Sequence, residues 1–527
     1  MARPQYDFSV AQHRPQAIIK LYSGNTVYTL ETDLIAIARS KQIGQASGQW
    51  TIQLVDRVGS DGLTWQQRAQ TGDYIEIYEA NQPTAPQMVM RGFIINPQRN
   101  FDIGQTGGPT RYTQLAGLDM GYIVQANQVR YLWPIDPTAV VGNQYQLSSV
   151  YGIKPGAVTP SQFFSDTMDK LVNGVGVANM QEARQSGIPP KFATACDLPS
   201  QYQINTISVQ AYTGQYWNLL SYFSSAPFSE LFYVDLPSSP TMYYRQPPYR
   251  ALDGSYLGVF GKPTALLPTV AVKLVDKKSH ALGRSCNEMY AFFMTYSDLA
   301  MINQNLGYNY AAFFGGAAQN DITQDSIVGS VGTHNPSNPI YDKSIENRYG
   351  FQQLSISTPF ISALTQGFFS DVAVPMNTWM YNVFKHNDQF ESGTITVHGD
   401  PNITIGRYVH VPEWGMDFYV TGITDNFVQY QTWTMDLQVI RGYAYGTITN
   451  AQIYSSSGAK TTQPRMQPTQ TQKPTPPAPP PNPPGSPTGP KIQDAGSGAL
   501  PSNSPLAPPP PPNTHPAYPG GPPILGH

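Results

Sequence analysis

The sequence predicts a mainly β protein with some α structure, in which two similar small β-barrel domains flank a mixed α/β middle region. Short runs in which apolar and polar residues alternate, bounded by Gly, Asp, Asn or Pro, recur over residues 16–120 and again over 392–445. The two sets share the same order of strands and turns. A third observation adds a Pro-rich C-terminal tail, which we expect to be disordered or extended by itself.

A length of 527 residues exceeds what one hydrophobic core holds, so several domains are expected. Residues 210–250 belong either to the middle region or to the second barrel, and 251–350 are expected as an insertion. The expected boundaries are those of an N-terminal arm (1–15), a first barrel (16–130), the middle region (131–374), a second barrel (375–450) and the tail (451–527).

The composition favours contact with other proteins. Charged residues make up only 12% of the chain, against roughly 25% in ordinary soluble domains, and 33 tyrosines take part of their place. Interface cores are depleted in charge and enriched in Tyr, so such a surface suits extensive protein contacts. A Tyr-rich β protein without such contacts is the alternative. The net charge of −3, with no block of five like charges, lacks the basic footprint of a nucleic-acid-binding protein.

The cysteines and the N-terminus indicate where the protein is made. Cys196 and Cys286 have no metal-ligand spacing and form no disulfide framework, so the fold is not expected to depend on oxidation. The N-terminus MARPQYDFSV lacks the apolar run of a secretory signal, and no stretch of 18 apolar residues occurs. We therefore expect a soluble protein made in a cytoplasm, with no membrane partner.

The first barrel is predicted from six strand-like runs. In WTIQL, Trp50, Ile52 and Leu54 alternate with polar neighbours, as in a strand with one buried face, and Ile75 and Ile77 repeat the pattern. Six strands are about what a small barrel or sandwich needs. The runs are AIIKLY, TVYTLE, WTIQLVD, YIEIYE, MVMRGFII and RYTQLAG.

The middle region mixes helices and strands. TPSQFFSDTMDKLV (159–172) predicts a helix in which Thr159 caps the start and Pro160 takes the first helical position. A short helix is expected at 214–225, followed by two strands within 227–249.

Near residue 375 the pattern becomes helical again and then returns to strands. In MNTWMYNVFKH, Met376, Met380 and Phe384 fall at helical spacing. The next run, SGTITVHGDPNITIGRYVHV (392–411), has the pattern of a strand, a turn and a second strand, and strand-like runs continue to residue 445.

The two barrels match each other element by element. Chance similarity of short strands is the alternative, but four matched elements in the same order favour duplication. If three copies met around an axis, six similar barrels would form a ring with three-fold symmetry in its chains and nearly six-fold symmetry in its fold units. A last strand follows in each barrel. The matched pairs before it are SGQWTI (47–52) with SGTITV (392–397), GDYIEI (72–77) with GRYVHV (406–411), and RGFI (91–94) with TGIT (421–424).

Three stretches resemble the baseplate hub proteins of contractile-tailed bacteriophages. YWNLLSYFSSAPFSELFYVD, followed by TMYYRQPPY, resembles the family's helix–strand–strand passage with its Arg-x-x-Pro-[Tyr/Phe] ending, here Arg245 to Tyr249. RYGFQQLSISTPF (348–360) resembles the family's Tyr-Gly stretch. SGTITVHGDPNITIGRYVHV resembles the segment that closes the family's second tube-like barrel. The resemblance extends over residues 16–445, and the Pro-rich tail departs from it.

The resemblance implies a structural protein of the virion's tail baseplate, assembled in the host bacterial cytoplasm. It implies a homotrimer that adapts the hexameric tail tube to the trimeric central spike and is not an enzyme. The implied partners are the tail tube protein, the central spike protein and the neighbouring baseplate wedge proteins. Two other functions stay open: a receptor- or polysaccharide-binding tail protein, and a cell-wall glycosidase.

No catalytic, cofactor-binding or metal-binding residue is predicted. Glu230 and Asp235 are close enough in sequence to form a carboxylate pair, but in a strand a separation of five puts them on opposite faces. Cys286 with a distant His is a weak nucleophile signal, and no G-x-S-x-G motif is present. GVGVAN (174–179) lacks the third glycine of a dinucleotide-binding loop and follows a helix rather than a strand.

One group of residues resembles a set of metal ligands. His398 and His410 are expected on adjacent strands, where their side chains approach each other. Solvent-facing positions of alternating strands are favoured over metal binding, which is the alternative. The group consists of His398, Asp400, His410 and Glu413.

The tail contains the predicted partner-binding residues. Of the 49 prolines, 23 lie between residues 451 and 527. Proline repeats are already extended, so an aromatic groove binds them at a reduced entropic cost; a passive linker or a disordered end is the alternative. The predicted docking residues are Pro474, Pro476, Pro477, Pro479, Pro480, Pro508, Pro509 and Pro510.

Cutting the chain after residue 455 is expected to abolish docking of the tail onto the spike or a neighbouring baseplate protein. In a pull-down, the full chain should retain the spike protein and the truncated chain should lose it, because the proline repeats are gone. Circular dichroism of both chains controls for folding of the remainder. Equal retention would identify the tail as a passive linker or end.

Overall fold

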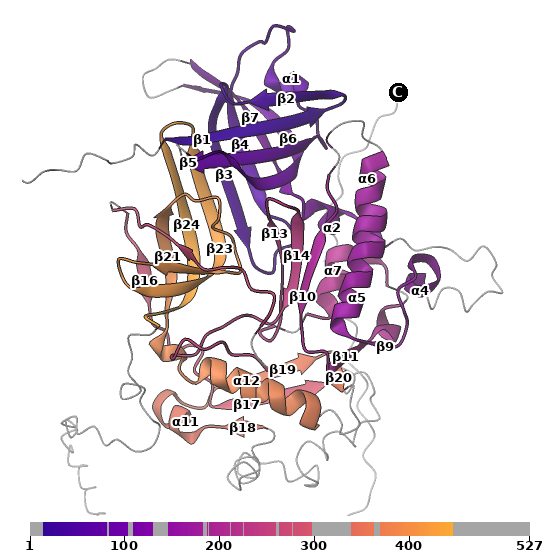
Figure 1. Cartoon of the computed structure of the whole chain (residues 1–527), viewed down its shortest axis with the longest axis vertical. Helices are drawn as coiled ribbons and strands as arrows, with labels where there is room; N and C mark the ends of the chain where they lie inside the picture. Colours follow the sequence, from indigo (N-terminus) through magenta and orange to yellow (C-terminus); the bar gives the residue numbers. More distant parts are fainter. Residues whose placement is uncertain are drawn as a thin grey trace, which may run out of the picture. The chain divides into compact units, whose positions relative to one another are not determined.

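The two predicted barrels are joined edge to edge in one 13-stranded sheet (Figure 1). The computed structural model describes residues 14–445 apart from 82–83, 104–108, 130–145, 183–186, 188, 211, 225, 260–262, 277, 298–338 and 363–368. The predicted fold class, mainly β with some α and with two similar barrels, is confirmed. The domain boundaries stay a prediction, and the predicted docking prolines, residues 474–510, lie outside the described residues.

The first barrel is built from the N-terminal strands. Ala17, Ile19 and Leu21 of its first strand are buried and alternate with half-buried residues, as a strand with one inward face requires. All six runs predicted as strands form strands. In their order across the sheet, the strands are β3 (Leu34–Gln42), β4 (Gln49–Val55), β7 (Pro109–Asp119), β6 (Gln87–Ile103), β5 (Tyr74–Asn81), β1 (Pro15–Ser23) and β2 (Thr26–Leu30).

Among the strands of this barrel, β3 is the one that the sequence pattern does not predict. Arg39 and Lys41 occupy the same strand face as the buried Ile37, where a one-sided strand ordinarily carries apolar residues. The period-2 signal is therefore lost over the second half of β3.

The second barrel follows the same strand order. Its sheet carries most of a separate hydrophobic core, in which Ile395, Val409 and Leu437 are fully buried. In order, its strands are β16 (Ala281–Gly283), β21 (Glu391–His398), β24 (Thr432–Tyr443), β23 (Met416–Val428), β22 (Tyr408–Val411) and β15 (Val270–Ala271).

Residues 270–275 close the second barrel. Val270 and Ala271 pair with β22 in parallel, and the N–H of Val272 donates to the His410 carbonyl at 2.8 Å. The same segment then reaches β21, where the N–H of His398 donates to the Lys273 carbonyl at 2.9 Å. The wall of this barrel thus includes a segment that lies more than a hundred positions earlier in the chain than β21.

The two barrels are equivalent in five consecutive strands. The order β3-β4-β7-β6-β5 in the first corresponds to β16-β21-β24-β23-β22 in the second. The sixth strand differs in direction, since β1 pairs antiparallel with β5 whereas β15 pairs parallel with β22. The predicted match of Gly72 with Gly406 is confirmed: both have positive φ, +90° and +76°. Gly72 N–H donates to Ile94 O at 2.7 Å and Gly406 N–H donates to Val420 O at 2.9 Å, so the same turn begins the same strand twice.

Two of the predicted matches are shifted along their strands. Ladder partners place Trp50 opposite Gly117 and Gly393 opposite Val439, so 50–52 corresponds to 393–395 and not to 395–397. Likewise 91–94 corresponds to 417–420 and not to 421–424, since Tyr74 faces Phe93 as Tyr408 faces Tyr419. Both errors are an even number of residues. An even shift keeps every side chain on its face, so the hydrophobic pattern does not reveal it.

A three-stranded sheet separates the second barrel from a layer of helices. One face, with Phe232 and Val234, belongs to the core of the second barrel, and the other, with Leu231 and Tyr233, belongs to the helical core. Both faces are therefore buried. The sheet consists of β10 (Ala193–Asp197), β14 (Pro240–Arg245) and β13 (Glu230–Asp235).

The predicted helices are present. The Thr159 side chain accepts from the Gln162 N–H at 3.2 Å at the start of α5 (Pro160–Asp166), which continues without a break into the π-helix η1 (Thr167–Val177). The other predicted helices are α7 (Tyr216–Tyr222) and α12 (Val374–Phe384). None of the helices among the described residues has the length and apolar composition that crossing a membrane requires.

The remaining elements are short. A sheet of β18 (Ile340–Tyr341), β17 (Phe292–Ser297) and β19 (Gln353–Thr358) packs against α12 (Figure 1). There the Thr295 hydroxyl donates to Asn377 Oδ1 at 2.7 Å. The others are α1 (Trp65–Arg68), α2 (Tyr122–Ala126), β8 (Gln128–Val129), α4 (Gln146–Tyr151), β9 (Ala157–Val158), α6 (Ala178–Glu182), β11 (Tyr202–Asn205), η2 (Thr206–Val209), β12 (Gly214–Gln215), α11 (Lys343–Tyr349), β20 (Phe360–Ser362), η3 (Phe369–Ala373) and η4 (Asn387–Gln389).

A loop of the second barrel fills the gap between β1 and β3 of the first. The buried amide of Gln429 accepts from the Ala17 N–H at 2.8 Å and donates to the Ala17 carbonyl at 3.1 Å. Its backbone N–H donates to Ile35 O at 3.0 Å. The Gln429 side chain thus makes the two hydrogen bonds with Ala17 of β1 that a neighbouring strand would otherwise make.

Replacing Gln429 by Ala is expected to lower the free energy of unfolding by about 1–3 kcal/mol, because the buried N–H and C=O of Ala17 lose their partners. Gln431→Ala, at an exposed position in the same loop, is the matched control and should change it by less than about 0.5 kcal/mol. Chemical denaturation followed by tryptophan fluorescence measures both. Equal effects of the two variants would contradict the closing role of Gln429.

Candidate functional site

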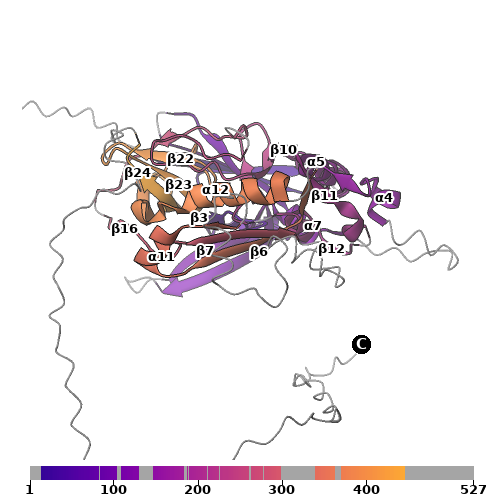
Figure 2. The same cartoon turned by 90° about the horizontal axis from the view of Figure 1, so that it is seen from below.

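The two barrels meet where β3 of the first pairs with β23 of the second. The strands run antiparallel over seven residue pairs, from Gln42 opposite Gly422 to Ala36 opposite Val428. We call this pairing, with the side chains around it, the seam. Figures 1 and 2 show β3 and β23 side by side, although nearly four hundred residues separate them in the chain.

The seam buries aromatic side chains of the second barrel in the core of the first. Phe427 and Trp433 both belong to that core, and Phe427, with an exposed fraction of 1%, lies opposite Ile37. The Trp433 indole N–H donates to Asp425 Oδ1 at 2.8 Å, which satisfies its buried polar atom. Separating the barrels would expose both rings to water, so the seam is held by apolar burial as well as by backbone pairing.

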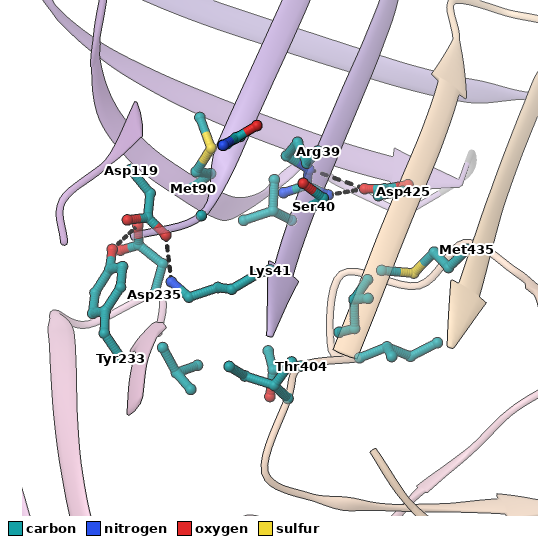
Figure 3. Close-up of a pocket in the computed structure, with 17 residues that line it drawn as sticks. Arg39, Ser40, Lys41, Met90, Asp119, Tyr233, Asp235, Thr404, Asp425 and Met435 are labelled. Carbon is teal, nitrogen blue, oxygen red and sulfur yellow. Dashed lines mark hydrogen bonds and ion pairs between the residues drawn. The ribbon is translucent and has the colours of Figure 1, made fainter. Parts of the chain in front are cut away.

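A cluster of buried and half-buried charged side chains lies along the seam (Figure 3). Arg39 forms ion pairs with Asp425 and, at 2.6 Å, with Glu79. Lys41 forms an ion pair with Asp119, and its ammonium group lies 3.5 Å from the ring centre of Tyr233. We call this set of residues the seam cluster. Its members are Arg39, Lys41, Glu79, Arg91, Asp119, Asp235 and Asp425.

Asp235 joins the three-stranded sheet to the first barrel. It accepts from Arg91 twice, from Nη1 at 2.5 Å and from the backbone N–H at 2.6 Å, and also from the Tyr233 hydroxyl. Burial raises the pKa of Asp235, against the opposing effect of Arg91. Because Asp235 lies at the end of β13, the seam cluster connects three parts of the fold: both barrels and the sheet between the second barrel and the helices.

The ionisation of Glu79, a member of the seam cluster, is disfavoured by burial. Its side chain is fully buried; Oε2 accepts from Arg39, and Oε1 has no hydrogen-bond partner among the described residues. Burial raises the pKa of Glu79 to about 8, although the charge of Arg39 opposes that rise. The cluster contains three basic and four acidic side chains, so a protonated Glu79 leaves its charges balanced. We infer that the folded protein holds Glu79 neutral at pH 7.

Burial also acts on the basic members of the cluster. It lowers the pKa of Lys41, although Asp119 and Asp235 oppose this. Burial works in the same direction on Arg39, but the charges of Glu79 and Asp425 outweigh it and raise the pKa of Arg39. The network therefore depends on each partner, because removing one leaves a buried charge unpaired.

A cavity of about 80 Å³ lies beside the seam cluster. Ligand-binding pockets typically measure about 300–1,000 Å³, so this cavity suits water and not a substrate. The lining includes Met90, Ile405 and Met435 together with members of the cluster. The seam cluster connects the two barrels and the three-stranded sheet, and the cavity beside it is smaller than a typical substrate pocket.

A second buried ion pair links the Arg-x-x-Pro-Tyr motif to the second barrel. Arg245 donates from Nε to Glu230 at 2.8 Å and from its other nitrogens to the carbonyls of Ala265 and Gly406. The Tyr419 hydroxyl lies 2.6 and 2.8 Å from the two Glu230 oxygens. Burial raises the pKa of Glu230, while Arg245 and Tyr419 oppose that rise. The motif thus has a packing role, in which it holds β14 against the turn that begins β22.

The structure separates the carboxylates that the sequence places near each other. Glu230 shares a strand face with Phe232 and points to the second barrel, whereas Asp235 is bound to Arg91 of the first barrel. The expectation that they lie on opposite faces is confirmed. Glu230 and Asp235 do not form one site.

The expected placement of His398 and His410 on adjacent strands is wrong. Their strands β21 and β22 are not neighbours, because residues 270–275 run between them and bond to both. His410 instead lies 2.6 Å from Asp417 Oδ1. Among the described residues, no group of three or more His, Cys, Asp or Glu side chains is arranged to hold a metal ion.

Cys196 and Cys286 are both free, and Cys286 is exposed. Burial raises the pKa of the Cys196 thiol to about 11, so it is not a thiolate at neutral pH. Residues 174–179, the glycine-containing run of the sequence, lie within η1 and α6 and not in a loop after a strand.

Three comparisons with known proteins were made. No protein-family model and no curated protein sequence matches the chain. Among solved structures, the 43 kDa tail protein of prophage MuSo2 from Shewanella oneidensis is 12% identical, with a TM-score of 0.42 over 80% of this chain and 98% of that chain. The tail protein from Neisseria meningitidis MC58 is 10% identical, with a TM-score of 0.39 over 81% of this chain and 96% of that chain.

A third similar structure comes from a secretion system. The E. coli c3393 protein, described as a type VI secretion component similar to T4 tail proteins gp27 and gp5, is 9% identical, with a TM-score of 0.30 over 82% of this chain and 79% of that chain. At these identities and TM-scores the similarities carry no conclusion about function by themselves.

The sequence pattern does not reveal the seam cluster. Its members are scattered from residue 39 to residue 425, and the two that lie in quoted stretches, Arg91 and Asp235, are not marked there as partners. Two local signals were available. Glu79 lies on the same strand face as the apolar Ile75 and Ile77 in the run YIEIYE. In addition, β3 carries two basic residues on one face. A charge on the inward face of a predicted strand indicates a buried partner, although it does not identify that partner.

The free energy of unfolding is expected to fall as the pH rises from 4.5 to about 8, and then to level off. The folded chain keeps a proton on Glu79 that the unfolded chain has already released. Glu79→Gln keeps the neutral shape and should remove this part of the slope, about 1.4 kcal/mol per pH unit. Glu413→Gln, at an exposed position, is the control and should leave the slope unchanged. Denaturation curves at several pH values measure it; equal slopes for Glu79→Gln and the natural chain would contradict a neutral Glu79.

Proposed function

We propose that this chain is a structural hub of a phage tail baseplate. Three copies form a ring of six barrels, which adapts the hexameric tail tube on one face to the trimeric central spike on the other. The hub is not an enzyme, and its partners are the tail tube protein, the spike protein and the neighbouring wedge proteins. It belongs to the virion and is assembled in the host bacterial cytoplasm.

The observation that carries this proposal is the seam between two equivalent barrels. The first barrel contributes its β3 edge and the second its β23 edge, which are different strands of the repeated unit. A joint between unlike edges is heterologous, so the same joint can be repeated from one unit to the next and closes into a ring when the rotation fits. One chain thus supplies two of six similar wall units.

The ring explains why a duplicated barrel suits an adapter. A partner with six-fold symmetry meets six similar barrels, whereas a partner with three-fold symmetry meets three copies of whatever distinguishes the two barrels. The two barrels differ in their surroundings. The second packs against the three-stranded sheet through Phe232 and Tyr243, and the first is bound to that sheet through Asp235 at its end.

The glycosidase alternative requires a carboxylic acid that reaches a substrate. Glu230, the carboxylate considered for that role, is buried and engaged by Arg245 and by the Tyr419 hydroxyl. This engagement favours a structural role for Glu230.

One chain has a mass of 57.9 kDa. The purified full-length protein is expected to have three times this mass and to appear as a ring with six lobes. Light scattering and negative-stain images of the same sample measure these properties, first alone and then with the tail tube and spike proteins added. A mass that stays at 57.9 kDa in every mixture would overturn the proposal.

A further inference from the structure

The internal duplication assigns an equivalent to each strand of the seam. β6 is the equivalent of β23, because both lie between equivalent neighbours in the sheet. Their ladders are also irregular at the same place: between Ile94 and Asn96 in β6, and between Val420 and Gly422 in β23. Counting from this irregularity, residues 96–101 correspond to 422–427.

β16 is the equivalent of β3. Ala281 faces Thr394 of β21 as Ala38 faces Thr51 of β4, and these partners are themselves equivalent. Residues 280–283 therefore correspond to residues 37–40 of β3.

Both equivalents have an edge without a partner strand among the described residues. The pairing of β6 with β5 ends at Phe93, and the turn before β5 continues the hydrogen bonds to Ile95. From Asn96 onward β6 pairs with β7 on one side only. β16 pairs with β21 alone. The seam inside the chain thus pairs β3 of the first barrel with β23 of the second. Their equivalents, β16 in the second barrel and β6 in the first, keep the corresponding edges unpaired among the described residues.

Phe101 shows what the free edge of β6 lacks. It occupies the position equivalent to Phe427, which is 1% exposed in the seam, yet Phe101 is 63% exposed and is the most exposed large apolar side chain of the described residues. Arg99 and Arg111 lie near its ring, at 5.6 and 5.4 Å from the ring centre. The same residue type at the same place in the repeat is buried where a partner barrel is present and exposed where none is present.

We propose that residues 280–283 of one copy of this chain, which are His280 and β16, pair antiparallel with residues 98–101 of β6 in a second copy, in the register of the seam. This inference rests on the proposed ring and specifies its joint between chains. Phe101 is the anchor of that joint and lies opposite His280, whose ring contacts Trp414 at 5.4 Å between centres. The expected pairs are Gly283 with Gln98, Leu282 with Arg99, Ala281 with Asn100, and His280 with Phe101.

Pro97 sets where this ladder begins. In the seam, Ile43 N–H donates to Thr421 O at 2.9 Å, and hydrogen-bonded pairs alternate along an antiparallel ladder, so the N–H of Ile423 faces β3. Pro97 is the equivalent of Ile423 and has no N–H to donate. Proline on the free edge of a strand limits indiscriminate pairing, so this edge accepts a partner only from residue 98 onward.

Disulfide trapping tests the register. In a Cys286→Ser background, Gly283→Cys and Gln98→Cys are combined in one full-length chain. The two positions form a pair without mutual hydrogen bonds, where Cα atoms lie about 4.5 Å apart and a disulfide fits. Mild oxidation is expected to convert the monomer band on a non-reducing gel into dimers and trimers. The matched control, Ser40→Cys with Thr424→Cys, occupies the equivalent pair inside the chain and should close without any change of mass.

Phe101→Ala tests the anchor. The variant should dissociate into single chains at concentrations where the natural chain remains assembled, because it lacks the aromatic ring that packs against the neighbouring copy. Phe351→Ala removes a ring that is 42% exposed elsewhere and should leave assembly unchanged. Light scattering on a dilution series measures both.

The outcomes separate this inference from the proposed function. Assembly with cross-linking at 283 and 98 supports both. Assembly of the double-cysteine chain without cross-linking, while the 40 and 424 control closes, overturns the register and leaves the ring. Assembly unaffected by Phe101→Ala overturns the anchor. Absence of assembly in the unsubstituted chain, with tube and spike proteins present, overturns the ring and the joint together.

Discussion

Backbone pairing between β3 and β23 is the constraint on which the rest of this fold depends. Each barrel alone would end in an unpaired strand edge, which is an aggregation hazard. In the seam, the edge of β3 in the first barrel forms backbone hydrogen bonds with the edge of β23 in the second, so that both barrels share one sheet. It also brings Phe427 into the core of the first barrel and lets the Gln429 loop close that barrel. The first barrel is therefore complete only when the second is attached.

The charges along the seam favour one alignment of the barrels over others. An apolar seam tolerates sliding by two residues, because each strand face repeats at that interval. Arg39 must meet both Glu79 and Asp425, and a slip would leave a buried charge unpaired, at a cost of about 3–5 kcal/mol. Keeping Glu79 protonated lowers stability at neutral pH but leaves the network without excess charge. The cluster thus contributes more to the specificity of the joint than to its strength.

The sequence was sufficient for the fold class, the duplication and the strands that alternate cleanly, such as β1 and β4. It was insufficient wherever a decisive contact is distant in the chain. β3 is concealed by the basic residues that the seam requires, and the closing segment 270–275 was expected within an insertion because its partners β22 and β21 lie far along the chain. The matched repeats were found but displaced by two or four residues, since only ladder partners fix the register.

The two joints of a ring built from this chain would not be equally strong. The internal seam has seven residue pairs, several buried ion pairs and a covalent connection that keeps its strands at high effective concentration. The proposed joint between chains would have Pro97 on one edge and only the short β16 on the other. In such a ring the internal seam would form first, within each newly made chain, and the weaker joint would form only where two complete chains meet in register. A strong seam inside the chain and a blunted edge outside it would limit pairing of single chains before assembly, because an exposed edge as long as β3 would pair with any strand it met.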